Sequence, residues 1–263
     1  MSLKEEAVAF VKDYFEKNAG PETKAVIGIS GGKDSAVVAA LCCAALGKDR
    51  VVGVLMPNGV QKDISDSRRV CEFLGIKNIT VNIEEAYCGL KSAVTEAINE
   101  AKLFDNAGLK DTPAQFNTNV PARLRMVTLY GVGAILGDVR ISCNGNLSER
   151  LAGFFTLWGD GAGDFAPLAY LFVDEVIQLG LELGLPEEMV RKAPSDGMCG
   201  MTDEEKLGFT YKELQLVASG HKEEVAAEKA EIIQKKIKAM AFKRRLLNLP
   251  CFIPSFKNPD DWK

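Results

Sequence analysis

One short segment between two apolar runs combines glycines, hydroxyl groups, a lysine and a carboxylate. Adjacent glycines let backbone N–H groups turn inward around an anion, and a helix that begins after them adds its positive N-terminus. The serine hydroxyls can donate hydrogen bonds, and the lysine can add a positive charge. The segment is predicted to bind phosphate, and its residues are Gly28, Ile29, Ser30, Gly31, Gly32, Lys33, Asp34 and Ser35.

Asp34 distinguishes this segment from the common nucleotide-binding loops. It follows Gly-Lys, where a Walker A loop requires Ser or Thr, and the four-residue gap between the glycines of a Walker A loop is also missing. The segment does not fit the dinucleotide-binding pattern G-x-G-x-x-G either. A carboxylate repels a phosphate unless a divalent cation lies between them, so Asp34 is a candidate Mg²⁺ ligand. The alternative is that Asp34 only caps the helix that follows.

Glu149 is the second candidate metal ligand. It comes just after residues 138–143, which are predicted to form a strand. Ligands of doubly wound sheets bind at the carboxyl ends of the strands, where Asp34 is also expected. The two carboxylates would leave the remaining Mg²⁺ positions to water and triphosphate oxygens. The alternative is a solvated glutamate at the start of a helix.

The elements that must position these residues alternate along the first part of the chain. Buried strands are predicted at 25–29 and 51–56, a third strand at 78–81, and helices at 3–15, 36–46 and 63–74. This order is typical of an α/β fold with a doubly wound parallel sheet and helices on both faces. Farther on, we expect a polar loop over 102–119, a strand over 138–143, and helices over 83–101, 120–136, 173–183 and 222–247.

The segment 192–211 has little apolar periodicity and is rich in Gly, Met, Ser and Asp. We expect a mobile lid there, although a packed surface loop is the alternative. Ser195 lies in this segment and could donate a hydrogen bond to a phosphate when the lid closes. No linker, repeat or low-complexity tract divides the chain, so a single domain over 1–263 is expected.

The overall composition excludes several classes of protein. A net charge of −4 argues against a broad nucleic-acid surface, and no apolar run is long enough to span a membrane. Seven cysteines without a C-x-x-C pair, with His221 the one histidine, argue against structural zinc. Unpaired thiols and an acidic N-terminal start without a signal-peptide pattern lead us to expect a cytoplasmic protein.

The Ser-Gly-Gly-x-Asp-Ser loop resembles the pyrophosphate loop of the N-type ATP pyrophosphatases, which have the adenine nucleotide alpha hydrolase-like fold. That family cleaves ATP between the α- and β-phosphates to adenylate an oxygen, and a nitrogen or sulfur nucleophile then displaces AMP. The resemblance of the loop implies this reaction class but does not identify the substrate.

Four further segments resemble the NAD⁺ synthetases within that superfamily. They are Asn119–Met126, Asn144–Asp164, Lys192–Tyr211 and Lys243–Arg245. The resemblance implies amidation of deamido-NAD⁺ to NAD⁺, with ATP as co-substrate, Mg²⁺ as cofactor, and release of AMP and pyrophosphate by a homodimer. Because no segment is left for a glutaminase domain, free ammonia is the expected nitrogen donor.

The resemblance also implies roles for individual residues. Lys33 and Asp34 would be catalytic, and Asn144 and Ser195 would bind ATP together with Gly28 to Ser35. The substrate would be bound by Arg123, Asp164 and Lys243, the lysine reaching the substrate of the other subunit. From the residues alone, Arg123 and Arg125 are equally good candidates, Asp160 and Asp164 can simply cap turns, and Lys243 can lie on a solvated helix face.

Several positions depart from the family pattern. Asn144 replaces a threonine, Leu157 and Val173 replace lysines, and Phe242 replaces a histidine. These changes put individual contacts in question rather than the reaction. Two other functions stay open at this point: a tRNA-thiolating enzyme, which calls for a basic face and paired cysteines, and a non-catalytic nucleotide sensor, which the two absent lysines favour.

Overall fold

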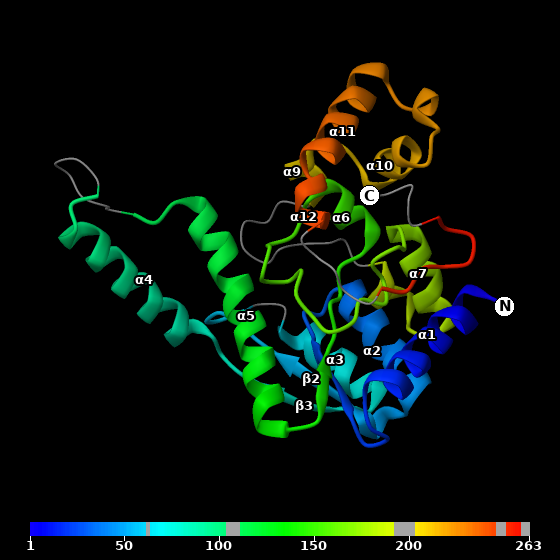
Figure 1. The fold of residues 1–263 in the computed structure, drawn as a ribbon, viewed down its shortest axis with the longest axis horizontal. Helices are drawn as coiled ribbons and strands as arrows, with labels where there is room; N and C mark the ends of the chain where they lie inside the picture. Colours follow the sequence, from blue (N-terminus) through cyan, green and yellow to red (C-terminus); the bar gives the residue numbers. More distant parts are fainter. Residues whose placement is uncertain (62–63, 104–110, 192–202, 246–250, 259–263) are drawn as a thin grey trace.

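The computed structural model describes residues 1–61, 64–103, 111–191, 203–245 and 251–258. Its centre is a four-stranded parallel sheet in the order β3–β2–β1–β4 (Figure 1). The chain adds strands outward from β1 to β3 and returns to the other side of β1 for β4, which opens a crevice at the carboxyl ends of β1 and β4. The predicted fold class is confirmed, with strands at Lys24–Gly28, Val51–Leu55, Lys77–Thr80 and Val139–Ile141.

Alternating side chains of β1 enter two separate apolar clusters. Ala25 and Ile27 pack with α1 (Leu3–Asn18), α2 (Lys33–Leu46) and α7 (Val173–Glu182). Val26 packs on the opposite face with Val52 and Val54, against apolar residues of α5 (Ala114–Leu136). Because both faces of the strand are covered, it has the continuous apolar run from which a parallel sheet is predicted.

The remaining helices surround this sheet or stand above its carboxyl edge. Leu151, Leu214 and Ile233 belong to a third apolar cluster, formed by α6, α10 and α11. The helices are α3 (Ile64–Leu74), α4 (Glu84–Glu100), α6 (Leu147–Ala152), α8 (Glu187–Val190), α9 (Asp203–Leu207), α10 (Tyr211–Ala218), α11 (Ala227–Ala239) and α12 (Ala241–Arg245), with 3-10 turns η1 (Lys48–Arg50) and η2 (Lys222–Glu224).

Three predictions about the connecting segments are wrong. α5 begins at Ala114 rather than at 120, because Pro121 lies buried inside the helix instead of at its start. The predicted helix 222–247 is broken at Val225, which is extended, and again at Met240, which packs against Gly153. Residues 203–211 of the expected lid contain α9 and the start of α10, with Phe209 and Tyr211 buried. The rest of the expected lid, 192–202, lies outside the described residues.

Two features of the molecular surface matter below. Figure 1 shows α4 and α5 projecting from one side of the sheet, and α4 buries none of its residues. At the C-terminal end, residues 251–258 fold back over α1, where Phe252 enters the main apolar cluster and Ser255 hydrogen-bonds to Glu6. Among the helices that the structure describes, none is long and apolar enough to cross a membrane.

Candidate active site

The glycine-rich loop follows β1 and leads directly into α2. Gly31 has a φ of +82°, and a Cβ atom there would lie 2.9 Å from the backbone nitrogen of Ser67, so only glycine fits. Gly32 caps α2 without any side-chain hydrogen bond. The first N–H groups of the helix therefore point toward the loop without a capping side chain, as an anion-binding helix N-terminus requires.

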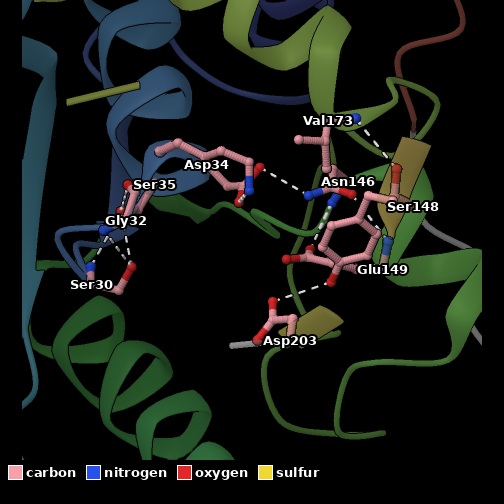
Figure 2. Close-up of polar contacts among 11 residues, drawn as sticks. Ser30, Gly32, Asp34, Ser35, Asn146, Ser148, Glu149, Val173 and Asp203 are labelled. Atoms are coloured by element: carbon pink, nitrogen blue, oxygen red, sulfur yellow. Dashed lines mark hydrogen bonds and ion pairs between the residues drawn. The ribbon is translucent and has the colours of Figure 1, made fainter. Parts of the chain in front are cut away.

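The two serines of the loop hold its shape. The Ser35 hydroxyl donates to the carbonyl oxygen of Gly32 at 3.0 Å and accepts from the Ser30 N–H at 3.3 Å (Figure 2). Ser30 is exposed, whereas Ser35 is buried. The structure therefore gives Ser35 a role inside the loop, and Ser30 is the serine of the pair that faces outward.

The predicted Asn144 joins the ends of β1 and β4. Its side-chain amide donates to the carbonyl oxygen of Gly28 at 3.0 Å, and its Oδ1 accepts from the Ser142 hydroxyl at 2.7 Å. The polar segment after β4 is thereby held against the phosphate loop after β1. This is the crevice that the strand order predicts for a ligand.

Asn146, which the sequence analysis did not single out, connects the two predicted metal ligands. Its Nδ2 donates to Asp34 Oδ1 at 3.0 Å, and its backbone N–H donates to Glu149 Oε2 at 3.1 Å (Figure 2). Its Oδ1 accepts from the Glu149 N–H at 3.1 Å, which completes a capping box at the start of α6. The spacing Asn-x-x-Glu is a sequence signal that could have revealed this residue.

Asp34 and Glu149 therefore come together, as predicted, at the carboxyl edge of the sheet. Burial and the nearby Asp34 carboxylate raise the pKa of Glu149, and the Lys33 ammonium partly offsets this effect. Two carboxylates drawn together in a partly buried position favour a cation between them. Carboxylate oxygens are the donors that Mg²⁺ prefers, so the side chains fit the predicted ion.

Lys33 is the cation nearest to these carboxylates in the structure. Its ammonium lies 2.9 Å from Asp34 Oδ2, and its side chain is only 4% exposed. Burial alone would lower the pKa of Lys33, but the carboxylates of Asp34 and Glu149 outweigh it and the pKa is raised. Lys33 is therefore charged and paired within the predicted site.

A cavity of about 930 Å³ opens beside the phosphate loop. Asp34 and Glu149 line it together with Asn144 and three cations, Arg125, Lys206 and Lys243. Arg123, which the resemblance favours over Arg125, is exposed elsewhere on α5, where its Nε donates to the carbonyl oxygen of Leu157 at 3.2 Å. The structure thus brings Arg125 into this cavity and directs Arg123 away from it.

The other two predicted substrate residues have structural partners. Asp164 Oδ2 accepts from the Ile141 N–H at 2.7 Å, and its Oδ1 accepts from the Tyr130 hydroxyl at 3.2 Å. Lys243 donates to the carbonyl oxygens of Gly153 at 2.8 Å and Phe155 at 2.6 Å, within its own chain. Asp160 accepts from the Thr156 N–H at 2.8 Å, which is the turn-capping role considered for it.

Asp203 and Tyr211 form a second polar group close to Glu149. The Tyr211 hydroxyl donates to Asp203 Oδ2 at 3.2 Å, and both residues are buried. Burial and the carboxylates of Glu149 and Asp203 raise the pKa of Tyr211. Their segment was expected to be a mobile lid, so their position was not predicted. Ser195 lies outside the described residues.

Val173 occupies one of the positions where the family pattern has lysine. It begins α7, and its N–H donates to the hydroxyl of Ser148, in the helix that carries Glu149. Leu157 likewise contributes only its carbonyl oxygen, to Arg123. Among the described residues, Lys33 is the lysine that the structure places against Asp34.

The comparisons with known proteins agree with this geometry. The family model described as NAD synthase matches residues 3–247. The NH(3)-dependent NAD(+) synthetase of Pyrococcus furiosus is 37% identical over 92% of this chain and 93% of its own length. That of Alkaliphilus metalliredigens is 35% identical over 94% of this chain and 96% of its own.

Two solved structures extend the comparison to the fold. NMN synthetase from Francisella tularensis superposes with a TM-score of 0.78 at 30% identity, covering 97% of this chain and all of that one. NAD⁺ synthetase from Burkholderia pseudomallei gives a TM-score of 0.70 at 26% identity, covering 94% and 91%. A phosphate loop after β1, an acidic pair beside it and these matches along most of its length together show that the chain belongs to the NAD synthase family.

Proposed function

We propose that this protein is a ligase that converts deamido-NAD⁺, ATP and ammonia to NAD⁺, AMP and pyrophosphate. One observation carries the proposal: the phosphate loop and the Asp34–Asn146–Glu149 cluster meet at a single cavity. The curated relatives, which are named NH(3)-dependent NAD(+) synthetases, support ammonia as the nitrogen donor.

The reaction has two balanced steps. A carboxylate oxygen of the substrate attacks the α-phosphorus of ATP, and the bond to the bridging oxygen breaks, so that pyrophosphate leaves. Ammonia then attacks the carbonyl carbon of the acyl-adenylate, AMP leaves with the electron pair of the C–O bond, and the nitrogen loses one proton. No side-chain nucleophile is required, because catalysis rests on positioning and on charge stabilisation.

Each part of the site has a task in this scheme. The loop Gly28–Ser35 and Asn144 bind the nucleotide, and Lys33 stabilises negative charge on the phosphates. Asp34 and Glu149 hold Mg²⁺, which when bound neutralises charge on the triphosphate oxygens. Ser195 stays assigned to ATP by the family resemblance alone.

We propose that the protein is a cytoplasmic homodimer with the acid substrate bound across the interface. α5 presents Val127 and Ile135 to solvent at 58% and 88% exposure, and Arg123 lies on the same helix. Tyr130, which is also exposed, holds Asp164. Neither Arg123 nor Asp164 lines the cavity beside the phosphate loop, and Asp164 contacts α5 through Tyr130, which supports a role toward the substrate of a partner subunit. Lys243 binds backbone carbonyls of its own chain, so its reach across the interface rests on the resemblance.

A second acid substrate deserves a direct test. The similarity to the NMN synthetase of Francisella tularensis favours nicotinic acid mononucleotide, which has the same carboxylate on a shorter molecule. The apolar residues Leu157 and Val173 are consistent with a shorter substrate, because two cationic contacts of the family pattern are missing. The chemistry at the carboxylate is the same for both acids.

The test uses the purified full-length protein with ATP and Mg²⁺. Each acid is incubated with ammonium or with glutamine, and NAD⁺, NMN and AMP are separated by chromatography. We expect ammonium with deamido-NAD⁺ to give NAD⁺ and AMP in equal amounts, and Asp34→Asn to lose that activity. Preferred turnover of the mononucleotide would establish the second substrate, comparable turnover with glutamine would contradict ammonia dependence, and no AMP from either acid would contradict the ligase proposal.

A further inference from the structure

Lys33 occupies a position that is unfavourable for a cation by itself. It is the first residue of α2, where the helix dipole is positive, and its side chain is almost completely buried. Both effects disfavour an ammonium group unless negative charges lie close to it. The structure supplies them through Asp34, Glu149 and Asp203, all of which act to keep Lys33 charged.

The Lys33 ammonium uses the same carboxylate that a metal ion needs. Asp34 Oδ2 accepts from Lys33 Nζ at 2.9 Å, and Asp34 Oδ1 accepts from Asn146 Nδ2 at 3.0 Å. Both oxygens of Asp34 are therefore engaged before any metal arrives. A divalent cation bound to Asp34 would meet the ammonium at short range, and two positive charges at such a distance repel each other strongly.

Counting charges indicates when this repulsion can be overcome. Without a nucleotide, one ammonium and one divalent cation would bring three positive charges together at Asp34 and Glu149, the two carboxylates that act most strongly on Lys33, with Asp203 as a weaker third. The triphosphate of ATP adds about four negative charges, which can hold both the metal and the ammonium. The phosphate loop lies directly before Lys33 in the chain, so its ammonium has a short path from Asp34 to a bound phosphate.

We propose that Lys33 is the counter-ion of Asp34 in the free protein and that it opposes metal binding until ATP is present. Metal and nucleotide then bind as a coupled pair, with Lys33 transferring from the Asp34 carboxylate to the phosphates. This inference rests on the metal and ATP site of the proposed function and adds the order in which that site fills. Since the Lys33 ammonium contacts only this carboxylate among the residues that the structure describes, its substitution isolates the effect.

The experiment measures Mn²⁺ binding by electron paramagnetic resonance, without acid substrate or ammonia. We expect Mn²⁺ to bind Lys33→Gln about tenfold or more tightly than wild type in the absence of nucleotide. Lys33→Arg, which retains the charge, should bind Mn²⁺ as weakly as wild type. Lys229→Gln is the matched control, because it removes a lysine from a carboxylate pair of similar length, 2.7 Å, formed with Glu213 outside the cavity.

A second measurement uses wild-type protein and therefore does not depend on the folding of a variant. The affinity of a non-hydrolysable ATP analogue is measured calorimetrically with and without Mn²⁺, and the two ligands should strengthen each other at least tenfold, with a smaller factor in Lys33→Gln. Equal or weaker Mn²⁺ binding by Lys33→Gln, or coupling below about threefold in wild type, would overturn the proposal. A negative amidation assay leaves both measurements intact, whereas the absence of any Mn²⁺ binding with the analogue would remove the metal site itself.

Discussion

Glu149 has two tasks at the scale of a single residue, and they oppose each other. It caps α6 by accepting the Asn146 N–H, yet burial and the Asp34 carboxylate raise its pKa above the ordinary 4.5. A raised pKa in the folded protein means that ionisation of this carboxyl costs folding free energy. The contribution of Glu149 to stability is therefore full below pH 4.5 and is lost as the pH rises through the raised pKa.

We expect Glu149→Gln to unfold roughly 2–4 °C above wild type at pH 8 in the presence of a chelator. Glutamine keeps an oxygen that can accept the Asn146 N–H, but it carries no charge. The difference should shrink as the pH falls toward 4.5, because wild-type Glu149 then takes up a proton. Scanning calorimetry measures the shift, and the same variant should lose metal-dependent ATP binding.

Glu213 provides the matched control for this prediction. It occupies the same place in the capping box of α10, but hydrogen bonds from Lys229 and Thr210 lower its pKa. Its stabilising contribution is present above pH 4.5 and is lost as the pH falls, so Glu213→Gln should lower the unfolding temperature at pH 8. If both variants shifted in the same direction at pH 8, the environment inferred for Glu149 would be wrong.

Residue types at the loop were predictable because their chemistry is local. Asp34 follows a glycine pair and precedes a helix, and any such carboxylate beside a phosphate loop suggests a cation. Asn146 was not predicted, since its importance comes from a contact with Asp34, 112 positions away. The Ser35 hydroxyl was predicted for ATP, yet it bonds within its own loop, a competition that spacing alone cannot resolve.

At the scale of elements, the C-terminal segment 251–258 holds two helices in place. Phe252 is 4% exposed, and its ring centroid lies 5.7 Å from that of Phe10 in α1. Lys257 donates to Glu175 Oε2 at 3.0 Å, and the same oxygen caps the N-terminus of α7 through the Phe172 N–H. The segment therefore stabilises α1 and α7.

Phe252→Ala should lower the free energy of unfolding by about 3 kcal/mol, because it removes a buried ring and leaves a cavity beside Phe10 of α1. Phe256→Ala serves as the control, since that ring is 62% exposed and its loss should cost less than about 1 kcal/mol. Urea unfolding followed by circular dichroism compares the two. Similar losses for both variants would show that the segment does not anchor the core through Phe252.

The central strands β1 and β2 were predictable because buried parallel strands have continuous apolar runs, whereas all residues of the edge strand β3 are exposed. The elements above the sheet were harder to predict from the sequence. α6 is short, and α9 and α10 lie in a stretch rich in polar residues, where only the capping boxes at Asn146 and Thr210 signal a helix. The break at Met240 depends on its packing against Gly153, a contact between segments far apart in the chain.

At the scale of the whole molecule, the site exists because the chain adds β2 and β3 on one side of β1 and then places β4 on the other side. β1 and β4 are neighbours although more than a hundred residues separate them, and their carboxyl ends carry the phosphate loop and the Asn144–Glu149 segment. The doubly wound fold class was predicted, but the strand order that makes β1 and β4 neighbours was not. The glycines of α5 illustrate the limit: a Cβ atom on Gly133 would meet Val139 of the sheet, whereas Gly131 of the same helix has open space.

The surface around Gly131 leads to the last prediction, which concerns assembly. Val127, Gly131 and Ile135 are spaced four residues apart and therefore share one face of α5, and both large side chains are exposed. A face of this kind, beside a helix that buries nothing, is typical of a surface that another subunit covers.

We expect a mass of twice 28.5 kDa in solution. Light scattering should show that Val127→Glu with Ile135→Glu is monomeric, because charges on this face would lose their hydration in the dimer. Ile232→Glu, at a site on α11 that is 51% exposed, should stay dimeric as the control. A wild-type monomer that is active at the assay concentration would contradict the homodimer and with it the binding of substrate across the interface.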